Sequence, residues 1–225
     1  MTFSISGRCA KTGMFGIAVS SSSPCVAARC AHARAGVGVV ATQNITDPTL
    51  GPRGLDLMAS GLSAAEALEQ IKADARHIEY RQLALVDRHG NGAAFSGANT
   101  LGTHRTVIAP DVVAAGNLLS SPVVPEKMAE AFLGNDGKPL GDRLIAAMFA
   151  ALKAGGEEGP VHSVGMLLVR EVAWPVADLR VDWHEDDPIG ELARLWELWA
   201  PQLDAYVSRG INPSQAPSYG VPGDL

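Results

Sequence analysis

The order of strand-like and helix-like segments is the feature that most constrains the fold of this chain. Period-two alternation and short apolar runs indicate strands, whereas apolar residues at helical spacing indicate helices. Strands come first, and are followed by helices, strands, helices, strands and a last helix. The strand-like segments are 2–8, 14–22, 36–44, 81–87, 92–97, 104–110, 112–117, 162–172 and 178–184, and the helical segments are 53–61, 63–74, 125–134, 140–155 and 188–207.

Each of these blocks supplies one layer of the expected architecture. The order fits two antiparallel sheets packed together, with helices outside both, better than a doubly wound parallel sheet. Residues 26–36 are rich in small side chains and leave helix and strand equally open. No internal repeat or linker interrupts the chain before its Pro/Gly-rich end. We therefore predict one α+β domain over residues 1–205 and a C-terminal tail over 206–225.

Composition and charge limit the classes of function. Apolar residues make up 47% of the 225 residues and charged residues 19%, which is typical of a globular protein. The net charge is −6 and no cluster of Lys and Arg occurs, so we expect no nucleic-acid partner. The chain lacks a signal-peptide pattern and an apolar run of about 20 residues, so we expect no membrane partner. Cys9, Cys25 and Cys30 are odd in number, which favours free thiols in the cytoplasm.

Thr2 opens the first predicted strand and has two interpretations. Phe3 and Ile5 alternate with Thr2, Ser4 and Ser6, which predicts a half-buried strand with an ordinary Thr at its start. Alternatively, removal of Met1 exposes the Thr2 amine beside the Thr2 hydroxyl. An α-amine titrates at roughly pH 8, so it can take the hydroxyl proton as the oxygen attacks a carbonyl group. A retained Met1 would block that amine.

Two further stretches contain candidate binding residues at the ends of strands. Thr42, Gln43 and Asn44 end an otherwise apolar strand, and such groups either line a pocket at a sheet edge or form a turn. Asn117 follows a strand of small residues. Its amide, or a nearby backbone N–H, can stabilise an oxyanion, but the Gly-Asn pair is equally a turn.

A row of polar residues marks one face of the strand at 178–184. Arg180, Asp182 and His184 alternate with apolar residues, so they share a face. Such a row can hold a substrate carboxylate or orient a proton shuttle. It is also typical of the solvated face of an edge strand.

Other reactive residues give weaker signals. Cys25, Cys30 and His32 are spaced C-x4-C-x-H, which matches no standard zinc pattern, so we expect no metal and no cofactor. No cysteine has a neighbouring base that would make it a nucleophile. The serines at 20–23 lack the G-x-S-x-G context of a hydrolase and are interpreted as the polar end of a strand.

Several stretches together resemble a mostly bacterial family, the domain-of-unknown-function 1028 family, which is placed in the N-terminal nucleophile (Ntn) hydrolase superfamily. The matching stretches are TFSIS, AKTGMFGIAVSS, ARAGVGVVATQ, GPRGLDLMASGLSAAEAL, VDRHGNGAAFSG, AAGNLL and DLRVDWHEDDPIGEL. They follow the expected order over residues 2 to about 199. GNLL departs from the fuller Q-G-N of the family, and the Ser- and Cys-rich segment 20–34 is unusual.

The resemblance implies a four-layer αββα sandwich and a nucleophile at Thr2. It also implies that Thr42, Gln43 and Asn117 line a pocket, and Arg180, Asp182 and His184 lie on a matching stretch. The leading hypothesis is a cytoplasmic Ntn-type amidohydrolase that acts on a small amide or amino-acid-like compound.

Two alternatives stay open at this point. The first is a non-catalytic protein of the same fold that retains Met1 and binds a metabolite or partner. The other is a thiol- or metal-dependent enzyme that uses Cys25 and Cys30, and it ranks behind both the hydrolase and the binding protein. The closing helix carries large apolar residues on more than one face, which indicates either a homodimer contact or a cap on the core.

Overall fold

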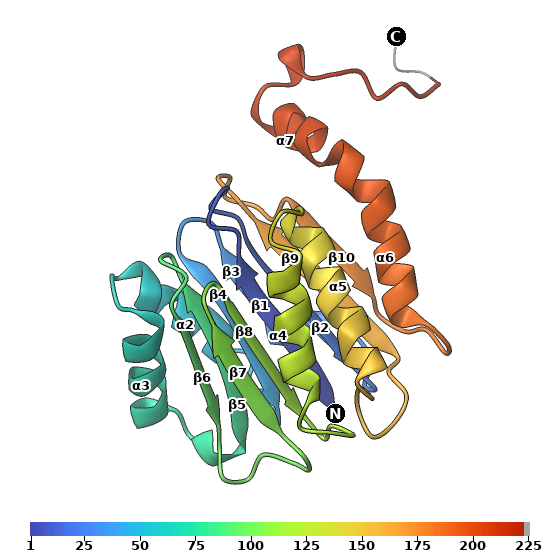
Figure 1. Cartoon of the computed structure of the whole chain (residues 1–225). Helices are drawn as coiled ribbons and strands as arrows, with labels where there is room; N and C mark the ends of the chain where they lie inside the picture. The colour runs from blue at the N-terminus through green and yellow to red at the C-terminus, as the bar shows by residue number, and fades with distance from the viewer. Residues whose placement is uncertain (223–225) are drawn as a thin grey trace.

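Two antiparallel β-sheets packed face to face form the centre of the molecule (Figure 1). The computed structural model describes residues 1–222. The larger sheet has the strand order β10-β9-β2-β1-β8-β7 and the smaller one β3-β4-β5-β6. The strands of the larger sheet are β1 (Thr2–Arg8), β2 (Phe15–Ser21), β7 (Arg105–Ala109), β8 (Val112–Asn117), β9 (Ser163–Val169) and β10 (Ala177–Val181). Those of the smaller sheet are β3 (Ala31–Arg34), β4 (Gly38–Asn44), β5 (Arg81–Asp87) and β6 (Gly92–Ser96).

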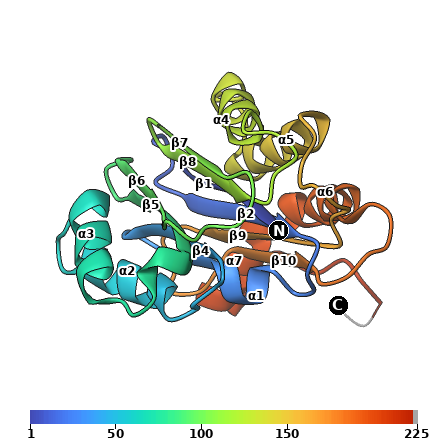
Figure 2. The same cartoon turned by 90° about the horizontal axis from the view of Figure 1, so that it is seen from below.

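Helices cover the outer faces of both sheets. Helices α4, α5 and α6 lie on the larger sheet, and α2 and α3 lie on the smaller one, as the end-on view shows (Figure 2). The predicted α+β fold with a four-layer αββα arrangement is therefore confirmed. The helices are α1 (Ala27–Cys30), α2 (Leu50–Ala59), α3 (Ala64–Asp74), α4 (Val124–Gly134), α5 (Leu140–Lys153), α6 (Pro188–Trp199) and α7 (Leu203–Ile211), with 3-10 turns at Ile78–Tyr80, Ala200–Gln202 and Pro213–Gln215.

Local sequence signals explain several of these elements. Ser63 and Glu66 form the expected capping box, in which each side chain bonds the backbone N–H of the other residue. The open segment 26–36 resolves into the short helix α1 followed directly by strand β3. The hairpin expected around Gly90 joins β5 to β6, and Gly90 has φ 85°, which a residue with a Cβ adopts at a cost.

Strand β1 differs from the half-buried strand that its alternation predicts. Phe3 and Ile5 pack into the core under α4 and α5, as expected for the apolar face. The opposite face, with Ser4 and Ser6, is also fully buried, because it lies against the smaller sheet. On this buried polar face Ser4 finds a hydrogen-bond partner on the smaller sheet, whereas the Ser6 hydroxyl has none among the described residues.

The closing helix is broken where a single helix over 188–207 is predicted. Pro201 lies in the 3-10 turn Ala200–Gln202 that separates α6 from α7. Proline has no N–H to donate and its ring clashes with the preceding turn, which explains the break. Helix α7 continues to Ile211, so it crosses the boundary expected between residues 205 and 206. Among residues 1–222, no helix combines the length and apolar character needed to cross a lipid bilayer.

Candidate functional site

Thr2 lies at the start of the central strand of the larger sheet. In the strand register it is opposite Asn117 of β8, and on the other side Phe3 pairs with Ser20 of β2. The chain start lies at one end of the sandwich, near the middle of the end seen in Figure 2. The Thr2 side chain is buried, and its hydroxyl donates to the carbonyl oxygen of Met1 over 2.5 Å. The nucleophile candidate is thus held against a carbonyl group.

Met1 is fixed by more than its peptide bond. Its carbonyl oxygen accepts a second hydrogen bond from the Ser21 hydroxyl, also over 2.5 Å. Its side chain lies close to Gly159, where an added Cβ would be 3.2 Å from the Met1 Cε. Met1 therefore covers Thr2 in the form of the chain that retains it.

A chain of buried polar side chains joins the two sheets next to Thr2. The Ser4 hydroxyl donates to Gln43 Oε1 (2.6 Å), and Gln43 Nε2 donates to Gln82 Oε1 (2.8 Å). Asn117 Nδ2 donates to the same Gln82 oxygen (3.0 Å). All four residues are almost fully excluded from solvent. Since buried amides without partners are costly, this network fixes the orientation of both Gln43 and Asn117.

Asn117 retains one acceptor that the network does not use. Its Oδ1 is buried and has no hydrogen-bond partner within residues 1–222. Leu118, the next residue, has φ 49°, an unusual conformation for a residue with a Cβ, which turns the chain sharply out of β8. Asn117 thus offers an unpaired oxygen on the strand beside Thr2.

Glu157 brings a carboxyl group to the same end of the larger sheet. Residue 157 forms a β-bridge with Leu119, two residues beyond Asn117, and its Oε2 accepts from the Ser22 N–H (3.2 Å). Its Oε1 is buried without a partner among the described residues. Burial raises the pKa of the Glu157 carboxyl to about 7, against the opposing effects of the positive N-terminus and the Ser22 hydrogen bonds. This group is therefore partly protonated at neutral pH.

Two of the predicted binding residues point away from Thr2. Thr42 is on the opposite side of β4 from Gln43, and its hydroxyl donates to the carbonyl oxygen of Asp47. Asn44 bridges two neighbouring loops, donating to the Tyr80 carbonyl and accepting from the Leu101 N–H. The structure therefore brings Thr2, Gln43 and Asn117 together and places Thr42 and Asn44 elsewhere.

The polar row predicted on a strand over 178–184 is not formed, because β10 ends at Val181 and only Arg180 lies in it, with Asp182 and His184 beyond its end. Strand β10 is at the edge of the larger sheet, with β9 and β2 between it and β1. Arg180 forms an ion pair with Asp178 on its own strand (2.8 Å), and Asp182 is exposed. His184 Nδ1 accepts from the N–H groups of Asp186 and Asp187 ahead of α6. At about 4.8 Å per strand, Arg180 lies some 14 Å from β1.

The cysteines and His32 are dispersed. Cys25 is exposed, whereas Cys30 is buried with its sulfur 3.7 Å from the Thr46 hydroxyl. His32 packs against Gly51 of α2. Within residues 1–222, no group of three or more His, Cys, Asp or Glu side chains is arranged to hold a metal ion.

Sequence reasoning did not select Ser4, Gln82 or Glu157, or assign Ser21 to the site. Ser4 and Gln82 carried a usable signal, because each interrupts the apolar pattern of a strand that is buried on both faces. Glu157 lies in a short loop, AGGEEG, where nothing distinguishes it from the neighbouring Glu158. The bridge to Leu119 and the hydrogen bond from the Ser22 N–H bring it to the site.

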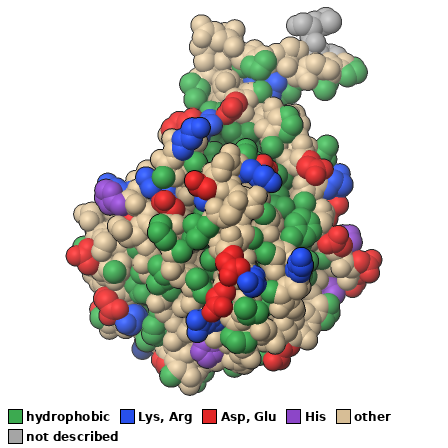
Figure 3. Space-filling view, viewed as in Figure 1, with side chains coloured by type: hydrophobic (Ala, Val, Ile, Leu, Met, Phe, Trp, Pro, Cys, Tyr) green, Lys and Arg blue, Asp and Glu red, His purple; other side chains and the backbone are tan. Residues whose placement is uncertain are grey.

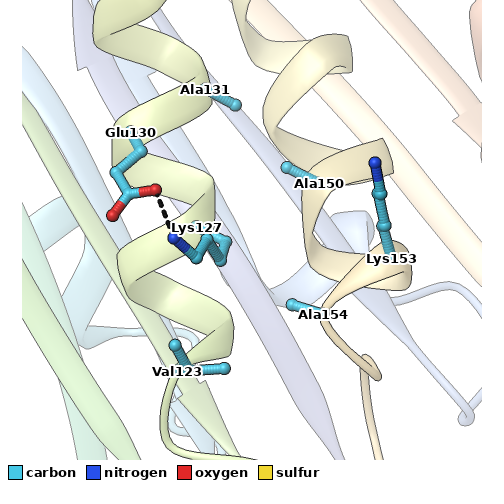
Figure 4. Close-up of a pocket in the computed structure, with 7 residues that line it drawn as sticks. All are labelled: Val123, Lys127, Glu130, Ala131, Ala150, Lys153 and Ala154. Carbon is cyan, nitrogen blue, oxygen red and sulfur yellow. Dashed lines mark hydrogen bonds and ion pairs between the residues drawn. The ribbon is translucent and has the colours of Figure 1, made fainter.

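A hollow on the outer surface contains none of these residues. It lies between α4 and α5 and has a volume of about 590 Å³ (Figure 4). Small side chains, among them Ala131 and Ala150, leave the space between the helices, and Lys127 is paired with Glu130 across 2.6 Å. The sheet between this hollow and the polar network separates it from the candidate site.

The fold and the site define the class of protein. It is an αββα sandwich in which β1, a central strand of the larger sheet, begins with Thr2, and the Thr2 hydroxyl bonds the carbonyl oxygen of Met1. A family model described as a family of unknown function (DUF1028) matches residues 2–192. The chain therefore belongs to the DUF1028 family.

The chain is also similar to solved structures. Protein SPO2555 from Silicibacter pomeroyi, described as a DUF1028 protein, is 32% identical, with a TM-score of 0.81 over 88% of each chain. Anbu, the ancestral β-subunit from Yersinia bercovieri, is 9% identical, with a TM-score of 0.42 over 91% of this chain and 97% of its own, which is too distant to support an argument. No curated protein matches the chain.

Proposed function

We propose that the protein is an Ntn-type amidohydrolase that cleaves a small amide or amino-acid-like substrate after Met1 has been removed. The observation that carries this proposal is the contact between the buried Thr2 hydroxyl and the carbonyl oxygen of Met1. This contact supports the proposal because the Thr2 hydroxyl and a carbonyl group lie together at a site that also contains the unpaired acceptors of Asn117 and Glu157. Unpaired buried polar atoms are rare in folded proteins and are expected where a ligand supplies the partner.

The reaction follows from the groups at this site. The Thr2 oxygen attacks the amide carbon of the substrate while its proton passes to the free Thr2 amine. The carbon–nitrogen bond then breaks, and the leaving amine takes that proton. Water hydrolyses the resulting ester, which releases the acid and restores the Thr2 hydroxyl. Asn117 and Gln43 orient the substrate, and the titrating Glu157 carboxyl lies close to the chain start where protons are transferred.

Replacement of Thr2 tests this proposal. Protein released from a ubiquitin-like fusion, so that Thr2 is the first residue, is assayed for amine release from a panel of small amides. We expect turnover in the parent protein, reduced turnover in Thr2→Ser and none in Thr2→Ala, with unchanged thermal unfolding. Equal turnover in Thr2→Ala and the parent would contradict the proposal.

A second candidate function is a binding protein that retains Met1. The observation that favours it is the pair of hydrogen bonds from Thr2 and Ser21 to the Met1 carbonyl, which would hold a retained Met1 in place beside Thr2. The intact mass of the protein isolated from its native cells distinguishes the two. Loss of Met1 is expected for the hydrolase, and a mass that always includes Met1 supports the binder.

The proposal also includes a cytoplasmic location. Three free cysteines support a reducing compartment.

A homodimer is also part of the proposal. Trp196 caps the core, and Trp199 donates to the Val176 carbonyl, so of the large apolar residues on α6 only Leu198 is largely exposed. Hydrophobic side chains are spread over the face of α4 and α5 among charged ones (Figure 3). Sedimentation equilibrium tests the dimer, and a monomer at all concentrations would exclude it.

A further inference from the structure

The serines that follow strand β2 form a chain of hydrogen bonds that ends on the carbonyl oxygen of Met1. Ser21 is fully buried and its hydroxyl donates to that oxygen over 2.5 Å. The Ser21 and Ser23 hydroxyls are 2.8 Å apart. Arg29 Nη2 donates to the Ser23 hydroxyl over 2.5 Å. Four groups are thus connected from a guanidinium to a carbonyl.

The direction of every bond in this chain is determined. A serine hydroxyl has one proton, and that of Ser21 is used on the Met1 oxygen. Ser23 must therefore supply the proton in the bond between the two serines, and Arg29 can only donate. All three bonds point towards the carbonyl oxygen. Successive donors that begin at a charged group polarise one another, which strengthens the last bond.

The protein holds this chain rigidly in place. Ser163 Oγ donates to the Ser23 carbonyl (2.6 Å) and accepts from the Val26 N–H (3.2 Å). Arg29 Nη1 also donates to the carbonyl oxygens of Pro24 (2.6 Å) and Cys25 (3.0 Å). Hydrogen bonds therefore fix both ends of the turn formed by residues 23–26. A preorganised donor of this kind costs no reorganisation when charge develops on its acceptor.

The Met1 carbonyl shows where a substrate carbonyl would lie. Its oxygen accepts the hydrogen bond that the Thr2 hydroxyl donates. When the Thr2 oxygen becomes bonded to a substrate carbon, the oxygen on that carbon lies in the same small region. Removal of Met1 leaves the Ser21 hydroxyl without this acceptor.

We propose that Ser21, supported by Ser23 and Arg29, is the donor that stabilises the oxyanion formed when Thr2 attacks a substrate carbonyl. This inference rests on the proposed hydrolase function. In the attack, the carbonyl π electrons move to the oxygen, the Thr2 proton moves to the Thr2 amine, and the Ser21 hydroxyl donates to the negative oxygen without losing its proton. Ser21 is then a catalytic residue, and Ser23 and Arg29 are positioning residues.

The first experiment tests the donor in protein that retains Met1 and needs no activity. The dipeptide Met-Thr occurs only at residues 1–2, so carbonyl-13C Met combined with 15N Thr gives one directly bonded pair. We expect the Met1 carbonyl resonance to move upfield in Ser21→Ala and to move upfield by a smaller amount in Ser23→Ala. In Ser21→Thr, which keeps a hydroxyl, we expect it to return to its position in the parent protein. Ser20→Ala is the matched control, because Ser20 is an equally buried neighbour whose hydroxyl donates to the Ser163 carbonyl instead. An unmoved resonance in Ser21→Ala overturns the proposal.

The second experiment tests catalysis in protein that begins with Thr2. The probe is p-nitrophenyl acetate, with acetylation of Thr2 followed by intact mass and p-nitrophenolate release. We expect Ser21→Ala to lower the rate constant of acylation about 100-fold with little change in KM, as for loss of one oxyanion donor. Arg29→Gln should lower it about 10-fold, and Ser20→Ala should leave it unchanged. If the parent protein is active and Ser21→Ala is equally active, only the proposed role of Ser21 is wrong. If the parent protein is never acetylated at Thr2, the proposed hydrolase function is wrong as well.

Discussion

The hydroxyl of Ser4 on one sheet donates to Gln43 Oε1 on the other across 2.6 Å, in an interface that also contains a cluster of buried apolar residues. This bond joins the strand that begins with Thr2 to the strand that carries Gln43. Gln82 continues the connection to Asn117. Both sheets are therefore linked by polar side chains next to the candidate nucleophile. Such a buried network stabilises one register of the sheets, provided that every member has a partner.

Gln82 is the central residue of this network, and its loss should destabilise the fold strongly. Its Oε1 accepts from Gln43 and Asn117, and its Nε2 donates to Ser96 Oγ and the Gly116 carbonyl (2.9 Å each). Gln82→Leu leaves buried partners unpaired, at about 1–3 kcal/mol each. We expect the free energy of unfolding to fall by about 3 kcal/mol or more in urea titrations. Ser4→Ala, which removes a single bond, should cost about 1 kcal/mol. Equal effects of the two substitutions would contradict a central role for Gln82.

The placement of Asn117 and Thr42 gives a test of which strand-end residues belong to the site. Asn117→Ala removes the unpaired acceptor beside Thr2, and we expect amide turnover to fall at least about 10-fold, as for loss of a buried hydrogen bond to the substrate. Thr42→Val is the matched control, because the Thr42 hydroxyl faces the Asp47 loop. Steady-state kinetics on protein with a verified Thr2 terminus measures both. A larger loss in Thr42→Val would place the substrate on the opposite face of β4.

Close packing at Gly165 should control the helix that carries Arg29. A Cβ at residue 165 would lie 2.4 Å from the Ala27 Cβ, which no side-chain rotation relieves. We therefore expect Gly165→Ala to displace α1 and to lower the free energy of unfolding by about 1–3 kcal/mol. Gly134→Ala is the control, because nothing lies within 4 Å of the added Cβ there. A crystal structure of the variant with α1 unmoved would contradict this expectation.

The sequence predicts the layers of this fold well, because periodicity reports directly on which residues are buried. It fails where burial and polarity conflict. Alternation in β1 predicts one solvated face, but Ser4 and Ser6 are buried between the sheets. The difference arises because Gln43, 39 residues away, supplies the partner of Ser4. A pairing at that distance has no local signal.

The candidate site is predicted only in part for the same reason. Thr2, Gln43 and Asn117 come from three strands that the topology brings together, and each carries a polar group at a strand end. Arg180 has an equally suggestive pattern, but the strand order places it at a sheet edge. Glu157 becomes significant only through its burial, which depends on a loop contact with Leu119.

Of the two adjacent glutamates 157 and 158, the buried Glu157 should control the pH dependence of stability. Burial raises the pKa of Glu157 from 4.5 to about 7, so the folded state holds a proton that the unfolded chain loses above pH 4.5. The folded state therefore binds more protons than the unfolded state between pH 4.5 and 7, and stability falls as the pH rises through this window. At about 1.4 kcal/mol per pH unit, the loss is about 3 kcal/mol. Glu157→Gln removes it, so the variant should gain stability over the parent from pH 5 to pH 8 in urea titrations. Glu158→Gln, at an exposed position, should follow the parent. If Glu157→Gln kept the pH dependence of the parent, the carboxyl group would have to titrate normally in the folded protein.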